Sequence, residues 1–288
     1  MLIIGGVHGD EFESMAAVRR VMELVEPSGL SGRLTLVPVV NEAAFDRKHR
    51  FAGDGLDLAR TCPGRYDGSI TERTAYAICQ KIVAVDFLID LHTGGTTLAV
   101  WPFAGYSLHP NQKVMAVQRR MARAFNLPLV WSTASRHKGR TLSVARDHDV
   151  PAIYAEYQGG ARCDPAGVDA YTDGCLNVLA KLDMIQRPPW QDRVRHVVED
   201  ERENSAFLQI QNPAPMAGYF EPAVALGQRI GVGEPIGGVC DVLGKRAVTI
   251  ESKQSGIVVV LKTFSRVDKD DSVAVIVEVD RPLGGFPT

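Results

Sequence analysis

Short apolar segments alternate with longer amphipathic segments through the first 187 residues, and this alternation constrains the fold more than any other feature of the sequence. Buried strands that alternate with amphipathic helices are typical of an α/β fold with helices on both faces of the sheet. We therefore predict a mostly parallel or mixed sheet sandwiched by helices. The expected strands are Leu2–Val7, Leu34–Val40, Phe87–Leu91, Leu98–Pro102 and Ala152–Tyr157. The expected helices are Glu13–Val25, Thr71–Val83, Asn111–Phe125 and Ala170–Leu182.

The pattern changes at the segment Arg187–Trp190, which contains two consecutive prolines. After it, short β-like runs at Val248–Ile250, Gly256–Leu261 and Val273–Val279 are separated by glycine and proline turns. We expect a domain boundary here, with an α/β domain over residues 1–187. Residues 188–288 are then predicted to form a small β-barrel or β-sandwich domain.

Charge and composition exclude some classes of partner. The chain has 32 Lys+Arg against 34 Asp+Glu, whereas binding to nucleic acid or to an anionic membrane by bulk electrostatics needs a basic surplus. No stretch approaches the roughly 20 apolar residues that a membrane span requires. The five cysteines include no Cys-x-x-Cys pair, which indicates free thiols in a reducing compartment. We predict a cytoplasmic protein without nucleic-acid or membrane partners, and leave a homo-oligomer open.

Polar side chains follow two of the expected strands. The first strand runs into a glycine-rich turn that carries His8 and Glu11, and His92 stands just past the third strand. Ligands of open parallel sheets gather at the carboxyl ends of the strands. Two histidines and one glutamate are a common donor set for catalytic zinc, which keeps its fourth position for water. Asp90 faces the same way as His92 in a strand, and whether it orients the imidazole is left open.

A third strand end supplies a carboxylate. Glu156 closes the apolar run that begins at Val150, and two glycines follow shortly after it. Hydrolysis at a metal needs a nearby carboxylate that takes a proton from water and passes it to the leaving nitrogen. An isolated glutamate at a strand end is usually a surface residue, but three coinciding strand ends favour a general base.

The segment Asn41–Gly64, which follows the second strand, is rich in arginine, and Arg65 comes directly after it. Such a run is normally a solvated face of the protein. If the segment lies over the metal, a guanidinium there can bind a substrate carboxylate or stabilise an oxyanion. The arginines inside the segment are Arg47, Arg50 and Arg60.

Taken together, these motifs resemble the succinylglutamate desuccinylase/aspartoacylase family of the zinc carboxypeptidase clan. The resemblance covers nearly the whole chain, and the motifs are specific in their order and spacing. Its main motifs are Gly5-Gly6-Val7-His8-Gly9-Asp10-Glu11, Asp57-Leu58-Ala59-Arg60-Thr61-Cys62-Pro63-Gly64, Asp90-Leu91-His92-Thr93-Gly94 and Ala155-Glu156. Two C-terminal segments, Gly218-Tyr219-Phe220-Glu221-Pro222 and Lys253-Gln254-Ser255-Gly256-Ile257-Val258, are also similar to family segments.

The resemblance implies one Zn²⁺ per chain, held by His8, Glu11 and His92, with Glu156 as the base that activates water. The implied reaction is hydrolysis of the amide bond of a small N-acyl amino acid or a related amide. The donor set by itself also suits iron, cobalt or manganese.

The resemblance also assigns roles to three arginines. It implies that Arg50 polarises the scissile carbonyl and that Arg60 binds a substrate carboxylate. Arg146, ten residues before Glu156, is expected to assist in binding the substrate.

The sequence departs from the family at two points. The usual Asp-Leu-Asn-Arg segment has Ala59 in place of the asparagine, so an amide that commonly helps to hold the substrate is missing. Relatives also usually carry more chain before the first metal motif. Two alternatives stay open, the first because its metal site would be identical and the second because of Ala59. One is a zinc carboxypeptidase that acts on peptides, and the other is a catalytically impaired relative that only binds metal or ligand.

Overall fold

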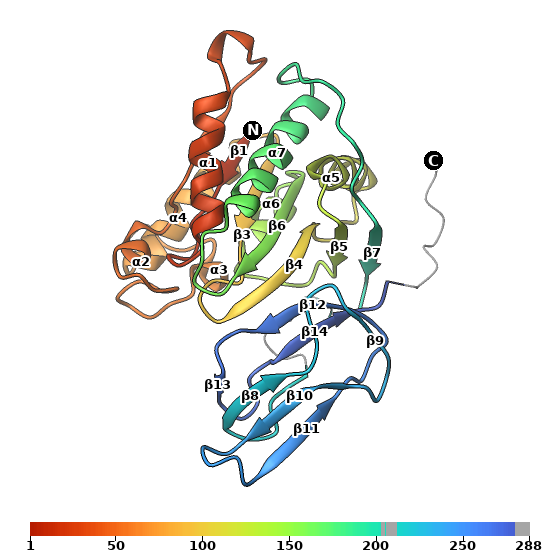
Figure 1. Cartoon of the computed structure of the whole chain (residues 1–288). Helices are drawn as coiled ribbons and strands as arrows, with labels where there is room; N and C mark the ends of the chain where they lie inside the picture. The colour runs from red at the N-terminus through yellow and green to blue at the C-terminus, as the bar shows by residue number, and fades with distance from the viewer. Residues whose placement is uncertain (203–204, 206–211, 280–288) are drawn as a thin grey trace.

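A large mixed sheet forms the centre of the molecule in the computed structural model, which describes residues 1–202, 205 and 212–279 (Figure 1). The strand order is β14-β12-β4-β6-β3-β1-β2, and β5, β7 and β9 pair at its side. The strands are β1 (Leu2–Ile4), β2 (Thr35–Val37), β3 (Leu88–His92), β4 (Leu98–Gly105), β5 (Leu129–Thr133), β6 (Ala152–Gly159), β7 (His196–Asp200), β9 (Arg229–Ile230), β12 (Gly256–Lys262) and β14 (Ala274–Val277). Strands β2, β1, β3 and β6 run parallel, and β4 is antiparallel to β6.

Helices cover both faces of this sheet because successive side chains of a strand point to opposite faces. Ile3 of β1 joins one core, together with α1, α5 and α7. Its neighbours Leu2 and Ile4 join a second core, together with α3, α4 and α6. These helices are α1 (Phe12–Leu24), α3 (Leu58–Thr61), α4 (Ile70–Ile82), α5 (Gln112–Phe125), α6 (Thr141–Asp147) and α7 (Pro165–Lys181). A short α2 (Glu42–Asp46) and a 3-10 turn (Pro27–Gly29) complete the helical elements.

Local sequence signals fix the ends of several helices. Ser69 and Glu72 form a reciprocal capping box at the start of α4. Asp164 accepts a hydrogen bond from the backbone at the start of α7, where Pro165 occupies the first turn. Asn126 ends α5 in a left-handed conformation, which asparagine tolerates better than most residues. The four predicted helices correspond to α1, α4, α5 and α7, and their bounds agree to within one residue except that α7 begins at Pro165 and not at Ala170.

A second, four-stranded antiparallel sheet lies in the C-terminal region, in the order β11-β10-β8-β13. It packs over a separate core that includes Phe220 and Ile236. The strands are β8 (Gly218–Pro222), β10 (Pro235–Cys240), β11 (Ala247–Glu251) and β13 (Arg266–Val267). The predicted fold class, an α/β sandwich with an additional β region, is confirmed.

The C-terminal region also extends the main sheet. Val260 of β12 pairs with Val100 of β4, and β7, β9 and β14 belong to the same sheet. The division of the chain at residues 187 and 188 therefore stays a prediction. Within the predicted second domain, residues 203–204, 206–211 and 280–288 lie outside the described ones.

Strand β5 was not predicted. Among the described residues, no helix has the length and apolar character needed to cross a membrane.

Candidate active site

The first site segment is the turn between β1 and α1, which carries His8 and Glu11. Gly6 in this turn has a φ of +63°, a backbone conformation that glycine adopts without strain. At Gly9 a Cβ would lie 2.2 Å from the carbonyl carbon of Ala44, so the turn packs directly on α2. His8 and Glu11 are thereby held in place, and both side chains are buried.

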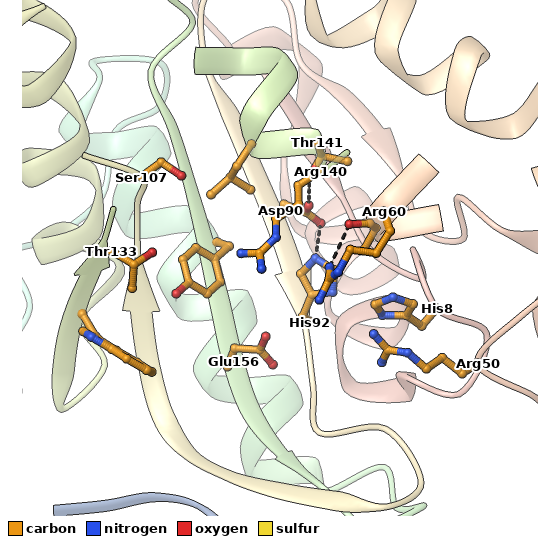
Figure 2. Close-up of a pocket in the computed structure, with 14 residues that line it drawn as sticks. His8, Arg50, Arg60, Asp90, His92, Ser107, Thr133, Arg140, Thr141 and Glu156 are labelled. Atoms are coloured by element: carbon orange, nitrogen blue, oxygen red, sulfur yellow. Dashed lines mark hydrogen bonds and ion pairs between the residues drawn. The ribbon is translucent and has the colours of Figure 1, made fainter. Parts of the chain in front are cut away.

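The second and third site segments are neighbouring parallel strands. His92 at the end of β3 is in register with Glu156 of β6, and Asp90 is in register with Tyr154. Residues in register on adjacent strands point to the same face, as do residues two apart on one strand. All four side chains therefore line one pocket, and the apolar residues between them face the core on the other side. Figure 2 shows Glu156, His92 and His8 around the same space.

Glu11 lies between the two histidines. Its Oε1 is 2.6 Å from His8 Nδ1, and its Oε2 is 3.0 Å from His92 Nδ1. Each of the three residues offers one atom that could bind a metal, and these three atoms lie within 4.8 Å of one another. We refer to these three residues as the His8–Glu11–His92 cluster. The structure thus brings together the three residues that the sequence analysis assigned to a metal.

The other nitrogen of each imidazole faces a second carboxylate. His8 Nε2 lies 3.0 Å from Asp57 Oδ1, and His92 Nε2 lies 3.1 Å from Asp90 Oδ1. The hydroxyl of Thr141 donates a hydrogen bond to the other oxygen of Asp90. Carboxylates in this position fix the orientation and tautomer of metal-binding histidines. Both Nδ1 atoms are therefore directed at Glu11.

Charge within the cluster shifts the pKa values of its members. Burial alone would raise the pKa of Glu11, but His8 and His92 hold it well below the ordinary range. Burial alone would lower the pKa of His92, but Asp90 and Glu11 raise it well above its usual value. The cluster thus binds positive charge strongly, either as protons or as a cation.

This arrangement fits a catalytic zinc ion. The cluster offers two imidazole nitrogens and a carboxylate from a buried position, and each imidazole has a carboxylate on its far side. Three protein donors of this type leave a coordination position for water or substrate. The same donors do not select zinc over other transition metals.

Glu156 stands beside the cluster without belonging to it. Burial raises the pKa of its carboxyl group to about 8, and the nearby charges of His92 and Arg50 oppose that rise. Tyr154, two residues earlier, is also buried, and burial with the charge of Glu156 raises its pKa beyond the usual range. A carboxylate with a raised pKa beside a cluster that fits a metal ion is suited to general base catalysis.

The arginines predicted from the sequence have different surroundings. Arg50 lies beside the cluster, with Nη1 3.5 Å from Glu11 Oε1 and Nη2 3.3 Å from Asp57 Oδ2. Arg60, on α3, lines the same pocket and donates a hydrogen bond of 2.8 Å to the carbonyl of Ala59. Both positions agree with the roles expected of these residues, which stay predictions.

Arg146 has different surroundings from Arg50 and Arg60, and its expected role in substrate binding stays a prediction. It is not one of the described residues that line the pocket. Its guanidinium pairs with Asp147 and donates to the carbonyls of Ser135 and His137, so it holds the loop before α6 instead. Arg140, at the start of α6, lines the pocket in its place.

Several other lining residues were missed. Ser107 follows β4, and Trp131 and Thr133 lie on β5; all three line the pocket, with Ser107 and Thr133 on the side away from His8 (Figure 2). Strand β5 was not predicted, so no sequence signal placed Trp131 and Thr133 here. For Arg140 and Thr141, which also line the pocket, the sequence did offer a signal. They stand at the start of a short helix, and helix starts commonly border ligand sites.

Comparison with known proteins gives consistent results over most of the chain. The model of the succinylglutamate desuccinylase/aspartoacylase catalytic domain matches residues 1–182. N-alpha-acetyl-L-2,4-diaminobutyric acid deacetylase of Halomonas elongata is 26% identical, over 98% of this chain and 83% of that protein.

Two solved structures have the same fold. A succinylglutamate desuccinylase/aspartoacylase from Rhodobacter sphaeroides is 25% identical, with a TM-score of 0.88 over 98% of this chain and 86% of the other. The product-bound ectoine utilization protein EutE (DoeB) from Ruegeria pomeroyi is 24% identical, with a TM-score of 0.87 over 96% of this chain and 84% of the other.

Proposed function

This chain belongs to the succinylglutamate desuccinylase/aspartoacylase family, and from that premise we propose that it hydrolyses the amide bond of a small N-acyl amino acid with the help of a zinc ion. The observation that carries the proposal is the convergence of the His8–Glu11–His92 cluster and Glu156 on one pocket. The deacylases similar to this chain support hydrolysis of an amide, and the Halomonas relative is named for an N-acetylated amino acid.

In this proposal His8, Glu11 and His92 hold the zinc, and Asp57 and Asp90 keep the two imidazoles in the required orientation. A zinc ion bound there supplies a Lewis acid for the scissile carbonyl and for the attacking water. Glu156, in register with His92, accepts a proton from the attacking water and delivers it to the leaving nitrogen.

Arg50 and Arg60 complete the machinery. The guanidinium of Arg50 lies against Glu11 and Asp57, where it can donate to the oxygen of the scissile carbonyl as negative charge develops there. Arg60 reaches the pocket from α3 and binds a carboxylate of the substrate. The products are a carboxylate from the acyl group and a free amine.

The test combines metal analysis with a substrate screen. The purified protein is expected to contain close to one zinc per chain and to hydrolyse members of a panel of N-acyl amino acids. A matched panel of short peptides addresses the carboxypeptidase alternative, and faster hydrolysis of the peptides would reject the deacylase proposal. Zinc-loaded protein that hydrolyses neither panel would reject the proposal as a whole.

Glu156→Gln tests the role of the base. The amide keeps the shape of the side chain but cannot accept the proton, so kcat should fall by about 10²–10⁴-fold while zinc content stays unchanged. Glu23→Gln, an exposed glutamate on α1, is the matched control and should behave like the wild type. Activity that survives Glu156→Gln would assign the proton transfer to another group.

A further inference from the structure

A second cavity lies on the opposite face of the main sheet from the candidate active site. Tyr157, which lines this cavity, follows Glu156 on β6, and successive residues of a strand point to opposite faces. The volume of the cavity is about 310 Å³, against about 100 Å³ for the pocket that contains Glu156. Cavities that bind small molecules commonly have volumes of about 300 Å³ or more. The second cavity is therefore separate from the candidate active site and large enough for a small ligand.

The cavity lies between α5, α7 and the segment 182–195, which joins α7 to β7 and runs beside α5 in Figure 1. This joining segment is held at two points. Arg187 donates hydrogen bonds of 2.9 and 2.6 Å to the carbonyl and the Oδ1 of Asp173 on α7. Asn126, at the end of α5, donates a hydrogen bond of 2.9 Å to the carbonyl of Gln191. Two consecutive prolines between these points restrict the backbone, so the fold forms the cavity in advance.

Much of the cavity lining is apolar. Phe125, Tyr157 and Trp190 contribute aromatic rings from α5, β6 and the joining segment. Ala166 and Ala170 of α7 also line the cavity, and their small side chains leave room beside the helix. An apolar group of a ligand would be removed from water against these side chains, which favours binding.

One polar side chain of the cavity lacks the partner that its burial requires. Asn177 lies on the same face of α7 as Ala170, lines the cavity and is only 2% exposed. Its Oδ1 has no hydrogen-bond partner among the residues that the structure describes. An amide buried without hydrogen bonds costs free energy, and a ligand that supplies them removes that cost. Because a side-chain amide both donates and accepts, a second amide is its natural complement.

The cavity also offers one positive charge. Arg193 lines it and is exposed, and the guanidinium of Arg193 forms no ion pair within the described part of the chain. Its backbone amide donates a hydrogen bond of 2.7 Å to Asn126 Oδ1, which fixes the residue next to α5. The other lining arginine, Arg187, is paired with Asp173. A single guanidinium suits a carboxylate, which it can bind through two parallel hydrogen bonds.

We propose that this cavity is a second ligand site, which binds a small carboxylate that carries an amide group and an apolar side chain, as N-acyl amino acids with apolar side chains do. The amide of the ligand pairs with Asn177, its carboxylate binds Arg193, and its apolar group lies against the aromatic side chains. The inference does not depend on hydrolysis in the other pocket, because the two sets of lining residues share no member.

Calorimetric titration with three ligands tests the site. N-acetyl-L-phenylalanine carries all three groups, N-acetyl-L-phenylalaninamide lacks the carboxylate, and 3-phenylpropionate lacks the amide. Every protein in the series carries Glu156→Gln, so that hydrolysis does not consume the ligand. We expect saturable binding of N-acetyl-L-phenylalanine, about tenfold tighter than the binding of either other ligand, because each of these has lost one polar contact.

Two variants separate the polar contacts. Asn177→Leu removes the amide, so it should weaken binding of N-acetyl-L-phenylalanine about tenfold and change that of 3-phenylpropionate by less than about threefold. Arg193→Gln should weaken both acids by about three- to tenfold and leave the carboxamide unaffected, since water screens an exposed guanidinium. Arg195→Gln is the matched control. Arg195 is exposed and is not among the described residues that line the cavity, so all three ligands should bind as before.

The same titrations show which pocket is occupied. Unchanged affinity for N-acetyl-L-phenylalanine in Asn177→Leu or in Arg193→Gln would place the ligand elsewhere and overturn the second site. The absence of saturable binding to the parent protein would overturn it as well. Thermal melting checks the fold, and Asn177→Leu should not lower the melting temperature, since an apolar side chain replaces an amide whose Oδ1 has no partner in the described structure. Arg193 is exposed, so Arg193→Gln tests the site even if Asn177→Leu is unstable.

Discussion

The His8–Glu11–His92 cluster and the pair formed by Arg60 and Arg140 line the same pocket but differ in how their charges are balanced. Each of the four imidazole nitrogens of the cluster lies within 3.1 Å of a carboxylate oxygen. Within the described part of the chain, neither Arg60 nor Arg140 has such a carboxylate. The first region is internally paired, whereas the nearest carboxylates of the second, Asp57 and Glu156, act on it from beyond ion-pair distance.

This difference separates two kinds of residue in one active site. Side chains that hold a metal must be oriented before it binds, and Asp57 and Asp90 orient the two imidazoles. Side chains that bind a substrate gain specificity when their charge is satisfied only by the correct ligand. Loss of a cluster residue should therefore affect metal and activity together, and loss of Arg60 should affect substrate preference.

His92→Ala should have the largest effect. It removes one of three donors, so metal content after dialysis should fall to near zero and hydrolysis should fall to background. Elemental analysis of the dialysed protein measures the first, and the acyl amino acid assay measures the second. His49→Ala, an exposed histidine outside the cluster, is the control and should retain both. Full zinc content in His92→Ala would show that the cluster is not the metal site.

Asp90→Asn should have a smaller effect of the same kind. The amide keeps the size of the side chain but loses the charge that orients His92, and partners in this position typically contribute 10–100-fold to metal affinity, so a loss of about that size is expected. Competition with a chromophoric chelator measures the affinity. Asp67→Asn, an exposed aspartate, should leave it unchanged. Unaltered metal affinity in Asp90→Asn would mean that metal binding by the His8–Glu11–His92 cluster does not depend on this carboxylate.

The smallest expected effect is on the stability of the fold. Loss of Arg119, which is paired with a carboxylate, should lower stability, whereas loss of Arg140 should raise it. Arg119 donates hydrogen bonds of 2.8 and 2.9 Å to Glu199, which also accepts one from Tyr106. Arg119→Gln should lower the free energy of unfolding by about 1 kcal/mol, after allowance for partial exposure. Arg140 is half-buried and has no carboxylate within ion-pair distance among the described residues, so Arg140→Gln should raise the melting temperature by at most about 2 °C.

The pH dependence provides a check on this comparison. Burial alone would raise the pKa of Glu199, but Arg119 and Tyr106 lower it below its ordinary value. The interaction is therefore fully present above the pKa of an unfolded glutamate and is lost as the pH falls through the lowered pKa. Thermal melts of Arg119→Gln and wild type should differ at pH 7 and converge in acid. A decrease in melting temperature for Arg140→Gln would contradict the unpaired state of that residue.

Much of the fold could be predicted because each main strand shows its own pattern. Residues Leu88–His92 and Ala152–Gly159 alternate between the two faces of a buried sheet, and their polar residues come at the carboxyl end. Parallel strands bring such ends together, so the grouping of His8, Glu11, His92 and Glu156 follows from local signals. The structure has this grouping, and the roles of the four residues stay proposals.

The arginines illustrate what the sequence could not provide. Arg140 and Arg146 lie at opposite ends of the seven-residue helix α6, and spacing from Glu156 does not tell which end borders the pocket. That choice depends on the packing of Gly139 against α3, a contact between segments about 80 residues apart. Strand β5 was missed for a similar reason, because its five buried residues are set by pairing with β4 and β7.

Asp57 connects parts of the site that have been described separately. Its Oδ1 accepts a hydrogen bond from the amide of Ala59 at the start of α3 and lies 3.0 Å from His8 Nε2, while its Oδ2 lies 3.3 Å from Arg50. A shift of His8 on metal binding would be transmitted through this carboxylate to the helix that carries Arg60. If metal loading changes the affinity for a carboxylate through this contact, a bound carboxylate must change the affinity for the metal by the same factor.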